Sequence, residues 1–195
     1  MPGAAHFETI AGEQDPAVRS EAADRCATLL VRGAHDTADE AVVGRVVSLA
    51  ESEGLETLAD LWASSPADSL AGCLWRLYLL RAWVYADPAA AAREFDAGRP
   101  LTPVHEVLAG VVEPPGPDEV RHLVDLVLQG VVRGDFADTL YRAAAFARVA
   151  AAGRTQIGAS NAATPYQSDL SAAKLVTMAD QLEHAASLES RGELA

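Results

Sequence analysis

The chain of 195 residues is acidic, with 28 Asp and Glu against 15 Lys and Arg and a formal net charge of −13. This length suits one domain whose core needs no metal or disulfide, and the charge lacks the basic surface that binds a phosphate backbone. Half of the residues are apolar but only 6% are aromatic. Because the surplus is alanine and valine, the composition predicts closely packed helices. We therefore expect an all-α protein, and the net charge argues against nucleic acid as a partner.

The N-terminal region, residues 1–14, shows no hydrophobic periodicity, and we expect a mobile tail before a single helical domain over residues 15–195. The start of the sequence has neither the basic nor the apolar region of a signal peptide. The apolar run Leu70–Tyr85 is shorter than the ~20 residues that span a bilayer, and it contains Arg76 and Arg81. These features predict a cytoplasmic protein with no membrane partner.

The first half of the chain alternates helix caps with apolar residues at helical spacing. Asp15-Pro16 and Asp87-Pro88 each place a capping residue before a proline, as at a helix start. Ser65 is the expected cap of the fourth helix, and Gly98 is expected to end the fifth. These signals predict helices over residues 16–32, 37–53, 55–63, about 66–86 and 89–97.

The second half continues the same pattern. Further helices are predicted over residues 103–111, 118–133, 136–153 and 169–189, with a polar loop at 158–168. The proline-rich stretch 113–117 is the sharpest boundary, and we interpret it as a connector inside one domain. The fold prediction is thus a single-domain bundle of about seven to nine helices. The fourth helix should be central and buried, with the helices containing Phe136 and Leu175 packed near it.

Two identical tripeptides, Ala97-Gly98-Arg99 and Ala152-Gly153-Arg154, occur in the chain. Tyr85-Ala86-Asp87 precedes the first and the similar Phe136-Ala137-Asp138 precedes the second, but the spacings differ. Helical repeats show sustained similarity at a fixed period, so these two matches predict no repeat architecture.

The fourth helix holds the candidate ligand-binding residues of the sequence. These are Arg76, Tyr78, Arg81, Trp83 and Tyr85, with Trp75 beside them. Arginine flanked by aromatic side chains can bind a carboxylate or phosphate. However, Arg76 and Arg81 lie about 140° apart around a helix and do not share a face. The alternative is that each arginine pairs with an acid of a neighbouring helix, such as Asp60, Asp87 or Glu94, while the aromatic residues fill the core.

Other candidate sites are weaker. Asp118, His122 and Asp125 have helical spacing suitable for a metal or a general base, but they lie opposite the apolar stripe and fit a solvated face. Cys26 and Cys73 stand apart in apolar surroundings and suit a core better than a disulfide. No nucleophile, phosphate-loop or dinucleotide motif occurs. We therefore expect no catalytic residues, no metal and no cofactor.

A comparison with one-domain bacterial repressors fails at the expected recognition helix. Residues 36–53 are rich in acids there, where DNA contacts need Arg, Lys, Asn or Gln. The leading functional prediction is a non-enzymatic protein that binds itself, for example as a homodimer, or another protein through a helical face. The alternative is a small-molecule binder or enzyme that uses Arg76 and Arg81. A DNA-associated regulator is the third hypothesis.

Overall fold

The computed structural model describes residues 16–32, 55–102, 117–119, 121, 122, 125, 136–158 and 170–195. Within these ranges the regular elements are helices and no residue lies in a strand, which confirms the all-α prediction. The helices are α1 (Pro16–Arg32), α3 (Leu55–Trp62), α4 (Leu70–Ala86), α5 (Pro88–Gly98), the 3-10 turn η2 (Arg99–Leu101), α7 (Phe136–Ile157) and α9 (Ala172–Ser190). The tail and the helices predicted at 37–53 and 103–111 lie outside the described residues, as does nearly all of the 113–117 connector.

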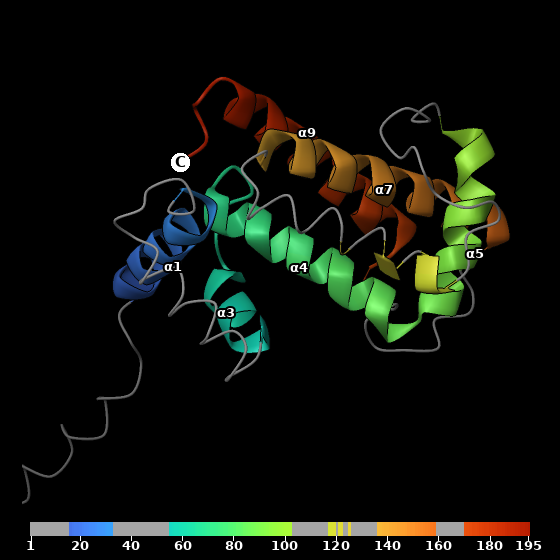
Figure 1. Cartoon of the computed structure of the whole chain (residues 1–195), viewed down its shortest axis with the longest axis horizontal. Coiled ribbons are helices and arrows are strands. Elements are labelled where there is room, and N and C mark those ends of the chain that lie inside the picture. The colour runs from blue at the N-terminus through green and yellow to red at the C-terminus, as the bar shows by residue number, and fades with distance from the viewer. Residues whose placement is uncertain are drawn as a thin grey trace, which may run out of the picture.

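Helix α4 links two groups of helices (Figure 1). At its beginning α4 contacts α1 and α3, which also contact each other. At its other end the chain turns into α5, which packs on α7, and α7 runs alongside α9. Because α4 also contacts α7 and α9, it meets the predicted neighbours. One flank of α4 is only half-buried, although the sequence predicted an enclosed helix.

Local capping chemistry sets the start of several helices. Asp87 accepts a hydrogen bond from the Ala90 N–H (2.9 Å) at the start of α5, as predicted. The cap of α4 is Ser69, which accepts from the Gly72 N–H (3.1 Å), so the prediction of Ser65 was wrong. The Pro66 carbonyl packs where a Gly72 Cβ would stand, 1.7 Å away. This turn over residues 66–69 delays the helix by four residues.

The crossing of α5 and α7 is built from small residues. A Cβ on Gly98 would lie 1.8 Å from the Val149 carbonyl oxygen, and a Cβ on Gly153 would lie 1.7 Å from the Glu94 carbonyl oxygen. The predicted end of α7 at Gly153 was therefore wrong, whereas α5 does end at Gly98 as predicted. Gly98 has right-handed helical φ and ψ, and α7 continues past Gly153 to Ile157. Both glycines serve helix contact, and Gly98 is also the last residue of α5.

The core around this crossing combines alanines with a few large side chains. Phe146 stacks on Phe95, with ring centroids 5.2 Å apart, and meets Trp83 at 6.2 Å. Arg154 is buried against Trp83, with 4% of its side chain exposed, and forms an ion pair with Glu94 at 2.9 Å. No described helix is long and apolar enough to cross a membrane.

The C-terminal residues contact α4 at its first residue and α1 at its last residue. The Leu70 N–H donates to the Ala195 carbonyl (2.8 Å), and the Leu194 side chain is buried. Arg32, at the end of α1, forms an ion pair with Glu189 of α9 and donates to the Leu194 carbonyl. The first and last described helices are thereby joined.

Candidate functional site

The structure places the five predicted ligand-binding residues in four different surroundings. Arg76 lies beside α9, where it bonds to Gln181. Arg81 and Tyr85 meet Asp125, and Trp83 is in the core. Tyr78 is half-buried and stacks on Trp75 with ring centroids 5.7 Å apart. The five residues therefore do not form one site, because the turn of the helix separates them.

Trp83 has a structural environment. Its side chain is fully buried, and the Arg154 guanidinium lies over its ring at 5.1 Å. This contact is a cation–π interaction in a buried setting. The Arg154 guanidinium is already paired with Glu94 and also donates to the Leu170 carbonyl. A ligand cannot reach Trp83 without opening the core.

A polar cluster lies on a different face of α4 from Arg76. It consists of Arg81, Tyr85 and Asp125. Arg81 Nε lies 3.2 Å from Asp125 Oδ1, and its guanidinium stands over the Tyr85 ring at 4.0 Å. The Tyr85 hydroxyl donates to Asp125 Oδ2, and this hydrogen bond is the main reason that its pKa is raised above the ordinary value. Arg81 thus does pair with an acid, but with Asp125 and not with any of the three acids named from the sequence.

The acids expected to neutralise the arginines have other roles. Glu94 pairs with Arg154, and Asp87 caps α5. The Asp60 backbone carbonyl accepts a hydrogen bond from Arg19. Two members of the predicted Asp118–His122–Asp125 group have other partners. Asp125 forms an ion pair with Arg81, and Asp118 forms one with Arg121 at 3.1 Å. Among the described residues, no group of three or more His, Cys, Asp or Glu side chains could hold a metal ion.

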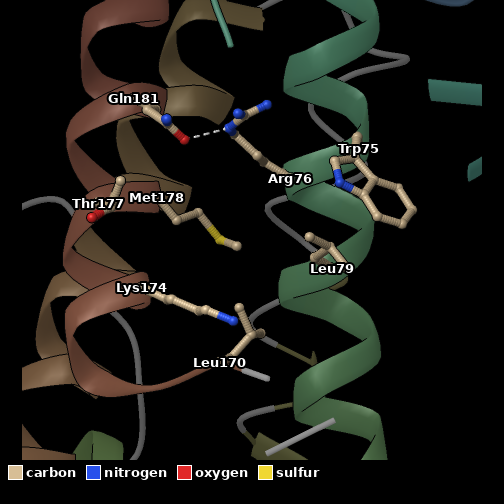
Figure 2. A pocket seen from close by; sticks show the side chains of 8 residues that line it. All are labelled: Trp75, Arg76, Leu79, Leu170, Lys174, Thr177, Met178 and Gln181. Atoms are coloured by element: carbon tan, nitrogen blue, oxygen red, sulfur yellow. Dashed lines mark hydrogen bonds between the residues drawn. The ribbon is translucent and has the colours of Figure 1, made fainter. Parts of the chain in front are cut away.

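A groove with a volume of about 240 Å³ runs between α4 and α9, and we take it as the candidate functional site (Figure 2). Its apolar walls are Trp75 and Leu79 from α4, and Leu170 and Met178 from the other side. Its polar lining consists of Arg76, Lys174, Thr177 and Gln181. None of these eight described lining residues is acidic. The groove therefore has apolar walls and carries two positive charges, those of Arg76 and Lys174.

Arg76 is held in place by neutral oxygen atoms. Its Nε donates to Gln181 Oε1 (2.7 Å) and its Nη1 donates to the Gly72 carbonyl (2.7 Å). A guanidinium has five N–H donors, so these bonds leave donors for another acceptor. In the described part of the chain no carboxylate forms an ion pair with Arg76. Burial lowers its pKa, and the opposing effects of Cys73 and Asp68 are smaller.

Lys174 and Gln181 belong to the groove but were missed from the sequence. Lys174 is the only lysine of the chain, and it is the third residue of α9. A cation there opposes the helix dipole, and a glutamate would suit this position better. Its head group extends from α9 toward α4 in Figure 2. The available sequence signal was the seven-residue spacing of Lys174 and Gln181, which places them two turns apart on one helix face.

Comparisons of the chain with models of known protein families, with curated proteins and with solved structures found no match. A functional interpretation therefore depends on the residues of the groove. Arg76 offers hydrogen-bond donors and charge to an anion, and the adjacent apolar wall offers contact to an aliphatic or aromatic group. The described groove lining thus places cationic side chains beside an apolar surface, an arrangement that can bind an anionic or amphipathic group.

Proposed function

We propose that this protein acts by binding another protein, and that the groove between α4 and α9 receives side chains of the partner. The observation that carries the proposal is Arg76, a half-buried cation with no described carboxylate partner, on the wall of an apolar groove. Removing a charge from water costs free energy unless an opposite charge compensates. A partner carboxylate would supply that compensation.

The size of the groove favours a protein partner over a metabolite. Its volume of about 240 Å³ is below the ~300–1,000 Å³ of pockets that enclose small molecules. It is sufficient for one or two side chains of a docked segment. Its lining includes Trp75, Arg76 and Met178, which are residue types enriched in protein interfaces. The neighbouring stacked pair of Trp75 and Tyr78 extends the half-buried surface along α4.

A matched pair of variants tests the proposal. Thr177→Glu places a carboxylate in the groove, where it competes for Arg76 and Lys174. Thr28→Glu is the control, because the Thr28 and Thr177 hydroxyls each donate to the carbonyl four residues earlier and both side chains are exposed. Thr28 lies on α1, away from the groove. Both changes add the same charge to an exposed helix surface.

The measurement is selection of binders from a displayed library of helical peptides on the purified wild-type protein. We expect binders that lose affinity for Thr177→Glu and keep it for Thr28→Glu. Self-association that Thr177→Glu abolishes, measured by sedimentation, would equally support the proposal with a second copy as the partner. Absence of any groove-dependent binder or self-association would contradict it. A melting temperature raised only by small carboxylates would assign a small-molecule ligand instead.

A further inference from the structure

The two cations of the groove stand at its opposite ends. Arg76 bonds to Gln181 (2.7 Å), so its guanidinium marks the level of that residue on α9. Lys174 precedes Gln181 by seven residues, which in a helix is about 10.5 Å along the axis. Figure 2 shows Met178 reaching into the space between the two cationic side chains. The order along the groove is therefore cation, apolar wall, cation.

The charge of this groove contrasts with that of the whole protein. The chain has a formal net charge of −13, yet the described lining contains Arg76 and Lys174 and no acid. Among the described residues, neither the Arg76 guanidinium nor the Lys174 ammonium forms an ion pair with a carboxylate. An occupant with negative charge at both ends and apolar groups between them complements this surface.

The spacing distinguishes between conformations of the occupant. On a helix, residues i and i+7 share a face and lie about 10.5 Å apart, with i+3 and i+4 between them on that face. On an extended strand, about 10 Å corresponds to three residues, and residues i and i+3 point to opposite sides. A strand therefore cannot present two carboxylates at this separation on one face, whereas a helix can.

We propose that the partner segment is an amphipathic helix with carboxylates at positions i and i+7 and apolar side chains at i+3 and i+4, docked along the groove between α4 and α9. One carboxylate meets Arg76, the other meets Lys174, and the apolar side chains contact Leu79 and Met178. This inference rests on the proposed function, which it deepens by specifying the chemistry of the partner.

The test uses synthetic helical peptides whose binding to the full chain is measured by fluorescence anisotropy. The first peptide has glutamates at i and i+7 and leucines at i+3 and i+4. The second has glutamines in place of both glutamates. In the third the second glutamate is moved to i+5, which places it about 140° around the helix from the first. All three have the same apolar residues, so differences in affinity report charge and its placement.

We expect the first peptide to bind most tightly. The Lys174→Gln variant should bind it roughly fivefold more weakly, because Lys174 is exposed, and should bind the glutamine peptide unchanged. The Arg76→Gln variant should lose about tenfold or more, because Arg76 is half-buried. The Lys174→Glu variant should recover affinity for a peptide in which lysine replaces the glutamate that meets residue 174. The matched charge exchange excludes a merely structural effect of the substitutions.

Since Lys174 is the only lysine, reductive ¹³C-methylation gives it a single side-chain reporter beside the terminal amine. Its methyl signal should shift on addition of the glutamate peptide and much less with the glutamine peptide. Equal affinity for all three peptides, with dependence on Thr177→Glu retained, would overturn this inference and leave the proposed function standing. Absence of binding by these peptides and by every displayed peptide would overturn both.

Discussion

Gly98 of α5 and Gly153 of α7 face each other where the two helices cross. A Cβ on either would lie 2.8 Å from the backbone nitrogen of the other and under 2 Å from a carbonyl oxygen of the opposite helix, at 1.8 Å for Gly98 and 1.7 Å for Gly153. The two Ala-Gly-Arg tripeptides of the sequence thus meet at one contact. They serve the same purpose, close approach of two alanine-rich helices.

Replacing either glycine by alanine should push α5 and α7 apart. We expect Gly98→Ala and Gly153→Ala each to lower the free energy of unfolding by about 3 kcal/mol or more, despite the better helix propensity of alanine. The control is Gly192→Ala, where φ is +70° and no described atom lies within 4 Å of the new Cβ. It should cost only about 1 kcal/mol. Urea unfolding measures all three, and equal effects would show that the crossing tolerates separation.

The buried ion pair of Arg154 and Glu94 gives a second prediction. Arg154→Ala leaves the Glu94 carboxylate, which is 15% exposed, without its cation and should cost about 3–5 kcal/mol. The control is Arg142→Ala, which breaks an exposed pair with Asp138 and should cost less than about 1 kcal/mol.

A substitution of Glu94, the ion-pair partner of Arg154, extends this test. Arg154→Met combined with Glu94→Gln should be less destabilised than Arg154→Met alone, because the second substitution removes the uncompensated charge. Thermal unfolding of the single and double variants measures the difference. A double variant that loses the sum of both single effects would contradict the assignment of Glu94 as the partner.

Cys73 makes stability depend on pH in the alkaline range. Burial raises the pKa of its thiol from 9.0 to about 12. A raised pKa in the folded state means that the protonated thiol favours folding. Its contribution is complete below pH 9 and is lost as the pH rises toward 12. Between pH 8 and 10.5 the free energy of unfolding should fall by about 2 kcal/mol from this group.

The matched variant for this test is Cys73→Ala. It should begin less stable, because a buried side chain is truncated, but its stability should decline less steeply over the same pH range. Urea unfolding at the two pH values gives both slopes. Parallel slopes for the wild type and Cys73→Ala would show that the thiol does not contribute.

Arg76 and Arg81 should differ from the buried Arg154. If each paired with a buried acid, as one interpretation of the sequence holds, replacement by alanine would cost about 3–5 kcal/mol. In the structure Arg76 bonds only to neutral oxygens, and the Arg81 and Asp125 side chains are about one third exposed, at 32% and 35%. We therefore expect Arg76→Met and Arg81→Met to change the free energy of unfolding by about 1 kcal/mol or less. A large loss in Arg76→Met would indicate a structural role.

Helix starts were predictable wherever the capping residue and the next turn of helix suffice, as at Asp87 and Pro88. Ser65 and Ser69 have the same local chemistry and precede the same helix. What selects Ser69 is the packing of the Pro66 carbonyl against Gly72, which no local pattern contains. Similarly, a glycine in an alanine-rich helix can signal a stop or a contact. Gly153 makes a helix contact because α5 packs against it, and α5 lies more than fifty residues earlier in the chain.

Only the α4 wall of the candidate site was predictable from the sequence. The helical angle between Arg76 and Arg81 correctly indicated two separate faces, and one of these residues lines the groove. The opposite wall comes from α9, about one hundred residues later, and its pairing with α4 depends on the whole fold. The same separation explains why Asp125, 44 residues beyond Arg81, was not recognised as its partner.

The contacts of Arg32 have a consequence for the order of events during synthesis. They join residues separated by 157 and 162 positions, at Glu189 and Leu194. Helix α1 leaves the ribosome well before α9, so these contacts can form only after more than 150 further residues have been synthesised. Until Glu189 has been synthesised, the helices among the described residues that α1 packs against are α3 and α4. Until then α1 lacks its ion pair with Glu189, and a helix whose apolar residues are incompletely packed is prone to mispair with another chain.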